Sequence, residues 1–250
     1  MCYKNIENMN ILEFKSLLAK SEFTPKEVLE ILAKDEEYSI RESVAKNPKT
    51  SKKILKILAK DKDYSVRESV AKNPKTSKEI LEVLAKDNYW ICISVTENSR
   101  TSKEVLGLLA KDKNYYIRSL VAKNLNASKE ILWMLAKDKD WRIRESVAKN
   151  LNVPKEILEL LARDKNYYTR ASVAENLNAP KKILKIIAKD ESYSVREFVT
   201  KNPKTPKEIL ELLAKDRNPY VRIRASAALN RASVVTENSN IPKKILEERK

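Results

Sequence analysis

The chain repeats itself about every 26 residues. The segment that begins at Thr24, TPKEVLEILAKDEEYSIRESVAKNPK, is followed at Thr50 by TSKKILKILAKDKDYSVRESVAKNPK. Related copies begin at Thr76, Thr101, Ala127, Val153, Ala179 and Thr205, and a ninth begins at Ile241. A period of this length is typical of a solenoid, in which each unit buries its apolar face only against its neighbours. We therefore expect one elongated array of about eight repeats.

The sequence pattern of each repeat predicts two helices. In the first copy, Thr24 is expected to cap a helix that begins at Pro25 and runs to about Asp35, with apolar residues at helical spacing. Ser39 is expected to cap a second helix of about two turns, which Asn47 and the following proline end. A helix this short can be partly 3₁₀. The predicted fold is all-α.

An aspartate is followed six residues later by an arginine in most copies, as in the pairs Asp35 and Arg41, Asp61 and Arg67, Asp138 and Arg144, and Asp190 and Arg196. This spacing resembles HEAT repeats. The fuller pattern P-x-x-[VI]-L-x-x-L-A-x-D…[VI]-R-x-x-V-A-x-N-P, over about residues 24–222, is similar to the leucine-rich repeat variant family. The resemblance implies a right-handed superhelix that alternates α- and short 3₁₀-helices, and a binding scaffold without one set function. The family's founding member has an iron–sulfur cluster in a cysteine-rich region, which this sequence lacks, so no cofactor is expected.

The composition argues against most catalytic sites. The chain has no histidine, one glycine (Gly107) and two cysteines (Cys2 and Cys92). These counts exclude glycine-rich phosphate loops, histidine-based catalysis and CxxC metal sites. No apolar run approaches the roughly 20 residues that span a membrane, and the first residues do not resemble a signal peptide. We expect a cytoplasmic monomer that does not enter membranes.

The boundaries of the repeats suggest three parts. Residues 1–23 are expected to cap the N-terminal end of the array, and residues 24–222 form the array itself. Residues 223–250 are expected to form a C-terminal capping helix and a partial repeat, because the stretch from Tyr220 to about Thr236 is rich in alanine and arginine and reads as one longer helix.

Two columns that recur in the repeats are interpreted as structural. The Asp/Arg column is expected to tie the repeats together, with each arginine binding a carboxylate in its own or in the next repeat. The aromatic column of Tyr38, Tyr64, Tyr89, Tyr115, Trp141, Tyr167 and Tyr193 is expected to pack between repeats.

The second helices of the central repeats depart from the common pattern. Repeats one, two, five and seven carry a Glu–Lys pair four residues apart, which is typical of a solvated face. Repeats three, four and six replace the pair, and large side chains occupy the column that holds serine elsewhere. A large apolar side chain on an exposed face is typical of a binding hot spot. The predicted ligand-binding residues are Trp90, Ile93, Tyr116, Leu120, Lys123, Arg142, Lys149 and Tyr168. The alternative is local repacking around the one-residue deletion in repeat three.

The charge suggests an acidic partner. The net charge is +16, and every copy has a lysine near the start of its first helix. These lysines are Lys26, Lys52, Lys78, Lys103, Lys129, Lys155, Lys181, Lys207 and Lys243. Such a row can follow a phosphate backbone, although neighbouring glutamates neutralise much of it. The leading hypothesis is a non-catalytic scaffold that binds an acidic protein segment or a nucleic acid along its concave face.

Two alternatives stay open. The first is a base-excising enzyme, since the architecture resembles HEAT-like alkylpurine DNA glycosylases; Glu97 or Glu175 would be the acidic residue. The second is a repeat array with no dedicated ligand.

Overall fold

A computed structural model describes residues 10–239 of the chain, with side chains described up to Arg231. The chain divides between Ile131 and Leu132 into two compact units. The odd-numbered helices are α1 (Ile11–Lys20), α3 (Tyr38–Lys46), α5 (Tyr64–Lys72), α7 (Tyr89–Glu97), α9 (Tyr115–Lys123), α11 (Trp141–Lys149), α13 (Tyr167–Glu175), α15 (Tyr193–Lys201) and α17 (Pro219–Ser239). The even-numbered helices are α2 (Lys26–Leu32), α4 (Lys52–Leu58), α6 (Lys78–Leu84), α8 (Lys103–Leu109), α10 (Lys129–Leu135), α12 (Lys155–Leu161), α14 (Lys181–Ile187) and α16 (Lys207–Leu213).

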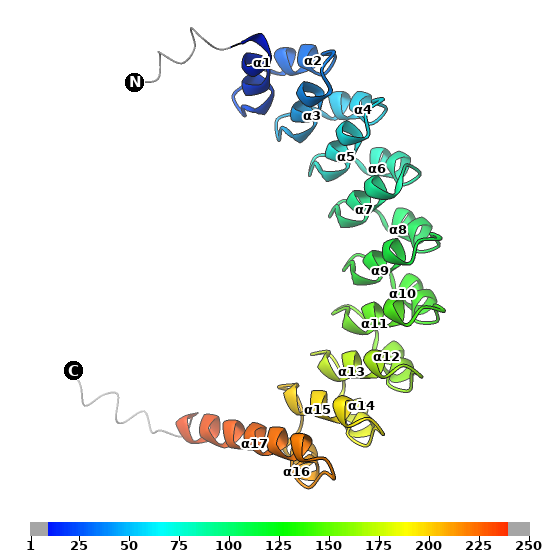
Figure 1. The fold of residues 1–250 in the computed structure, drawn as a ribbon, viewed down its shortest axis with the longest axis vertical. Coiled ribbons are helices and arrows are strands. Elements are labelled where there is room, and N and C mark those ends of the chain that lie inside the picture. Colours follow the sequence, from blue (N-terminus) through cyan, green and yellow to red (C-terminus); the bar gives the residue numbers. More distant parts are fainter. Residues whose placement is uncertain (1–9, 240–250) are drawn as a thin grey trace, which may run out of the picture. The chain divides into compact units, whose positions relative to one another are not determined.

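Each unit consists of two layers of helices (Figure 1). The odd-numbered helices stack directly on one another, α3 on α5 and α13 on α15, whereas the even-numbered helices contact mainly the odd-numbered helices beside them. The odd-numbered layer is therefore the more closely packed layer of each unit. The predicted all-α architecture of two-helix repeats is confirmed.

The lengths of the two helices in a repeat differ from the expectation. The first helix spans 7 residues and the second spans 9, and both are α-helical. The second helix is therefore the longer one, with no 3₁₀ segment in the described residues. Its capping residue also lies earlier than expected: Tyr38 is already helical, and in the next repeat the side chain of Asp63, not that of Ser65, accepts the capping hydrogen bond at 2.8 Å.

The first helix of each repeat also begins one residue later than expected. Lys26 opens α2, and Pro25 occupies the cap position. The hydroxyl of Thr24 does not cap this helix but donates to the carbonyl of Leu18 at 2.6 Å. The same bond recurs from Thr50 to Val44 and from Thr76 to Val70. In the repeats that begin with threonine, this hydroxyl therefore ties the turn to the preceding helix.

The core follows the repeat. In the first copy, Leu29, Ile40 and Val44 are buried with at most 1 % of their surface exposed. Their equivalents in the next copy, Leu55, Val66 and Val70, are buried to the same degree. Because each copy presents the same apolar residues to its neighbours, the core is continuous along each unit.

The ends of the array carry additional helices. Helix α1 packs on α2 and α3, and α17 packs on α15 and α16. Helix α17 begins at Pro219, within the region that the sequence analysis assigned to the array, rather than at residue 223. The partial ninth repeat lies outside the described residues. Among the helices that the structure describes, none is both long and apolar enough to cross a membrane.

Candidate binding surface

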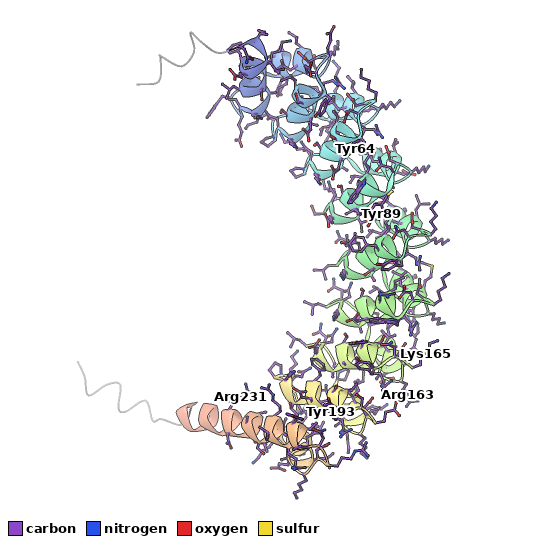
Figure 2. All side chains as sticks on the ribbon, viewed as in Figure 1. Tyr64, Tyr89, Arg163, Lys165, Tyr193 and Arg231 are labelled. Carbon is purple, nitrogen blue, oxygen red and sulfur yellow. The ribbon has the colours of Figure 1, made fainter. Side chains whose placement is uncertain are left out.

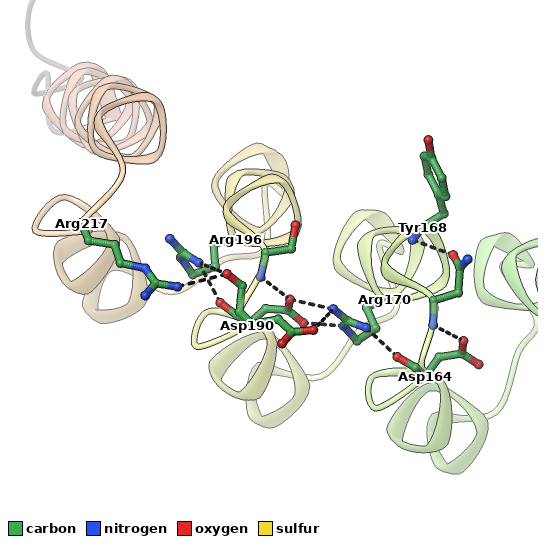
Figure 3. Close-up of polar contacts among 9 residues, drawn as sticks. Asp164, Tyr168, Arg170, Asp190, Arg196 and Arg217 are labelled. Atoms are coloured by element: carbon green, nitrogen blue, oxygen red, sulfur yellow. Dashed lines mark hydrogen bonds and ion pairs between the residues drawn. The ribbon is translucent and has the colours of Figure 1, made fainter.

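The Asp/Arg column forms a ladder between repeats. Arg144 binds Asp164 of the next repeat with two hydrogen bonds, from Nε at 2.6 Å and from Nη2 at 2.8 Å. Its Nη1 donates to the backbone carbonyl of Asp138 in its own repeat at 2.8 Å. The same geometry joins Arg41 to Asp61, Arg67 to Asp87 and Arg196 to Asp216. It also joins Arg170 to Asp190, and Figure 3 shows this pair. Of the two partners that the sequence left open, the carboxylate is the one in the next repeat.

A second ladder is made by the asparagine that follows each odd-numbered helix from α3 to α15. Asn73 donates from Nδ2 to the carbonyls of Ala45 at 2.7 Å and Asn47 at 3.2 Å in the preceding repeat. Its Oδ1 accepts from the backbone of Lys75. The last carbonyls of a helix have no partner within the helix, so this amide caps the preceding odd-numbered helix. The sequence analysis interpreted the asparagine only as part of a helix stop.

These ladders leave no buried polar atom for a ligand. Within the described residues, every buried side-chain nitrogen and oxygen has a hydrogen-bond partner. The same part of the chain holds no group of three or more His, Cys, Asp or Glu side chains that could hold a metal ion.

The arginine ladder is interrupted in repeat three. Cys92 stands in the arginine column and is buried, and its Sγ lies 3.4 Å from the carbonyl of Ala85. Burial, together with the nearby charges of Asp112 and Asp87, raises the pKa of the Cys92 thiol to about 11. The thiol is therefore neutral at physiological pH. Because a cysteine side chain is never a cation, it cannot form the ion pair that the arginines of the other rungs form with the next aspartate, here Asp112.

Replacing Cys92 with arginine is expected to restore this rung and to raise the free energy of unfolding by about 1 kcal/mol, as for a hydrogen bond to a charged group after desolvation. The measurement is chemical denaturation of Cys92→Arg beside Cys92→Ser. An arginine variant no more stable than the serine variant would show that the shortened link, and not the missing guanidinium, breaks the ladder.

Three rings on the odd-numbered layer form a cluster in the first unit. The ring centroids of Tyr89 and Trp90 lie 5.1 Å apart, and those of Tyr89 and Tyr116 lie 6.4 Å apart. Trp90 is 60 % exposed and Tyr116 is 41 % exposed, and Ile93 and Leu120 are half-buried beside them. The predicted residues of this unit thus come from the solvent-exposed faces of α7 and α9. Tyr89, which was assigned to packing, joins them.

The predicted residues of the second unit form a separate cluster. The ring of Tyr168 stacks on Trp141 with centroids 5.0 Å apart, and it also contacts Tyr167. The guanidinium of Arg142 lies 5.2 Å from the centroid of Trp141 and pairs with Asp140. Figure 3 shows the ring of Tyr168 pointing away from the arginine ladder.

The aromatic column is more exposed than packing alone requires. Tyr38, Tyr64, Tyr115, Tyr167 and Tyr193 are each between 40 % and 53 % exposed. They occupy the first position of the odd-numbered helices, and Tyr64 and Tyr89 are labelled in Figure 2. The column therefore borders the candidate surface.

Much of the charge on this layer is balanced. Lys72 pairs with Glu68 at 2.6 Å and Lys149 with Glu145 at 2.6 Å, and the pairs Lys46–Glu42 and Lys201–Glu197 repeat the arrangement. Lys149, proposed as a ligand contact, therefore already has a partner. Lys123 is exposed and has Ser119 where these pairs have glutamate.

The excess positive charge lies on the even-numbered layer. The predicted lysines occupy the first position of helices α2 to α16 and are exposed; Lys243 is outside the described residues. A second exposed basic column, which the sequence analysis missed, follows the end of each of these helices: Lys34, Lys60, Lys86, Lys111, Lys137, Arg163, Lys189 and Lys215. Arg163 and Lys165 are labelled on this side in Figure 2. The aromatic and the basic features thus belong to different layers.

The two glutamates considered for catalysis are the last residues of α7 and α13, and both are exposed. Trp90 lies seven residues before Glu97, which is about 10 Å along the helix axis. Neither glutamate is enclosed with the aromatic residues that would hold a base.

The comparisons with known proteins concern the fold. No protein-family model and no curated protein matches the chain. A solved leucine-rich repeat variant, described as having a novel repetitive structural motif, is 24% identical over 82% of this chain and 82% of its own, with a TM-score of 0.63. An engineered protein (13% identity, 91% of this chain and 76% of that chain, TM-score 0.35) and a designed armadillo repeat protein (14%, 91% and 96%, TM-score 0.26) are more distant. The chain shares the fold of the first of these proteins, as the repeat pattern predicted.

Proposed function

We propose that the chain is a non-catalytic binding scaffold that takes a protein segment along the odd-numbered layer. The observation that carries the proposal is the exposed cluster of Trp90 and Tyr116, in the column that holds Ser39 and Ser65 in the first two repeats. A half-exposed ring contributes little to folding but much to binding once a partner covers it.

The charge on this layer favours a protein partner over a nucleic acid. A nucleic-acid groove combines stacking rings with an excess of cations along the backbone path. Here the rings are present, but in the same unit Lys46 and Lys72 are paired with glutamates of the same layer. Tyr and Trp rings beside aliphatic side chains and balanced charges are typical of protein interfaces.

The test uses Trp90→Ser with Tyr116→Ser, because serine is the natural residue of this column in other repeats. Peptides are first selected on the wild-type chain from a displayed library of random 12-residue sequences. The double variant is expected to bind the selected peptides about 2–4 kcal/mol more weakly. Its thermal stability should fall little, because both rings are exposed.

Phe23→Ala is the matched control, since Phe23 is an aromatic residue that is 96 % exposed and lies outside the cluster. It should leave affinity unchanged. The double variant could instead be much less stable than the wild type, while the fraction that remains folded binds the peptides with wild-type affinity. That result would show that the rings contribute to the core and not to binding. Binding of single-stranded DNA with a steep salt dependence, lost in the double variant, would favour a nucleic-acid partner instead.

A further inference from the structure

Helix α4 differs from its neighbours on the even-numbered layer of the first unit. Its sequence is KKILKIL, with three lysines and no acidic residue. The helices on either side, α2 (KEVLEIL) and α6 (KEILEVL), carry glutamate at the positions of Lys53 and Lys56. Lys60 follows the helix, so four exposed lysines gather on one short element.

These lysines line a groove between α4 and α6 with a volume of about 520 Å³. Its lining includes Lys52, Lys53, Lys56 and Lys60 on one side, and Ala59, Ile80 and Val83 as apolar residues. Val83 is 55 % exposed. The groove is therefore basic along one wall and apolar along its floor.

The acidic groups near the groove neutralise little of this charge. Lys53 pairs with Glu30 at 3.4 Å, and both side chains are largely exposed. Glu79 also lines the groove, and a hydrogen bond with Ser77, the residue that precedes its helix, lowers the pKa of its carboxyl, so this side chain is negatively charged. The lining therefore sets four lysines against one glutamate, and its balance is positive.

The spacing of the lysines indicates how the acidic groups of a ligand would be spaced. Lys52 and Lys56 are four residues apart on α4, or about 6 Å along the helix, and Lys60 follows four residues later in the turn after it. Every second side chain of an extended peptide points to the same side, and these are about 6.6 Å apart. Carboxylates at alternate positions of an extended segment can thus meet successive lysines, while the other side chains face Ile80 and Val83.

We propose that this groove binds an extended protein segment in which acidic and apolar residues alternate. The apolar floor gives such a segment more contact than a bare polyanion would obtain, and no aromatic side chain lines the groove to stack a base. The site lies on the layer opposite the aromatic cluster, so it is a second binding surface that does not depend on the first.

The lysine pattern recurs once in the second unit. Helix α14 has the sequence KKILKII, followed by Lys189. The binding experiment therefore uses a chain that already carries Lys182→Glu and Lys185→Glu, which removes this second basic helix. The probe is a fluorescent ten-residue peptide of alternating Glu and Leu, and affinity is measured by fluorescence anisotropy.

Adding Lys53→Glu and Lys56→Glu is expected to weaken binding at least about tenfold, because two cations of the groove become anions. The change turns α4 into KEILEIL, close to the sequences of α2 and α12, so the fold should be retained. A peptide of alternating Glu and Ser, with the same charge, should also bind at least about tenfold more weakly to the unmodified groove, because it leaves the floor uncovered.

Lys62→Glu with Lys113→Glu is the control. It changes the net charge equally, outside the groove, at positions where repeats one and seven have Glu36 and Glu191. Equal weakening by the control and by the α4 variant would overturn the proposal, as would equal affinity for the two peptides. Tighter binding of a single-stranded oligonucleotide through the same lysines would also overturn it.

Discussion

Replacing Arg144 with alanine is expected to lower the free energy of unfolding by about 2–4 kcal/mol. Arg144 and Asp164 form a buried pair whose side chains are 7 % and 9 % exposed. The substitution removes the guanidinium from the carboxylate of Asp164, and it removes the Nη1 donor from the backbone carbonyls of Asp138 and Lys139. Equilibrium denaturation in urea measures the loss.

Arg222→Ala supplies the matched control. Arg222 makes the same two bonds, to the carbonyls of Asp216 and Arg217, but it is exposed and no further repeat within the described residues offers it a carboxylate. Its loss is expected to cost less than about 1 kcal/mol. If both variants lose the same amount, the inter-repeat ion pair contributes nothing beyond the carbonyl contacts.

The pH dependence follows from the same pair. Burial favours the neutral form of Asp164, but the hydrogen bonds from Arg144 and the backbone of Asn166 outweigh it and lower the pKa of the carboxyl below its usual 3.8. A lowered pKa in the folded state stabilises the protein above the unfolded pKa, and this contribution is lost as the pH falls through the folded value. The difference between the wild type and Arg144→Ala should therefore narrow below about pH 4.

The repeat explains why the fold could be predicted and why the direction of the ladder could not. Leucine and valine columns at helical spacing identify the buried face of each helix, and this inference does not depend on how the neighbouring repeat is placed. The partner of Arg144 is different, because the repeat places an aspartate both six residues before it and twenty residues after it. The backbone turn decides between the two: it presents the carbonyl of Asp138, and the side chain of Asp164, to the guanidinium.

The candidate surface was predictable in part. The substitution of Ser by Trp90 and Tyr116 signalled exposed rings, and these rings are exposed. The separation of the charge from the rings depends on which helix of each repeat lies in which layer, and local patterns do not contain that information. The sequence of α4 already lacks the glutamates that α2 and α6 carry. The net charge of the whole chain does not reveal this local excess of lysine.

A signal for the asparagine ladder was also present. The residue after this asparagine is Pro48 and Pro74 in the first repeats, but Leu125, Leu151 and Leu177 in repeats four to six. The asparagine stays where the proline changes, so it has a role other than ending a helix. Its side chain reaches into the preceding repeat, which a stop signal does not require.

Asn176→Ala is accordingly expected to destabilise the chain by about 1–3 kcal/mol. Asn176 is buried, and its Nδ2 donates to the carbonyls of Ala148 at 2.7 Å and Asn150 at 3.1 Å. Without the amide, the buried carbonyl of Ala148 loses this donor, at a cost of roughly 1–3 kcal/mol, whereas the carbonyl of Asn150 still accepts from the backbone N–H of Val153 at 3.2 Å. Asn178→Lys is the control, since Asn178 makes one exposed inter-repeat bond and lysine is natural there in repeats one and two.

Asn176→Asp separates the loss of hydrogen bonds from the loss of packing, because aspartate has nearly the same shape. At neutral pH its carboxylate would face two carbonyl oxygens, so this variant should be less stable than Asn176→Ala. The folded state then raises the pKa of the new carboxyl, and the variant gains stability as the pH falls and the protonated group can donate. Relative to Asn176→Ala at the same pH, the free energy of unfolding of Asn176→Asp should therefore increase as the pH falls from about 7 to about 5. The two variants could instead have the same free energy of unfolding at every pH. That result would show that water reaches these carbonyls and that the asparagine column contributes through packing and not through hydrogen bonds.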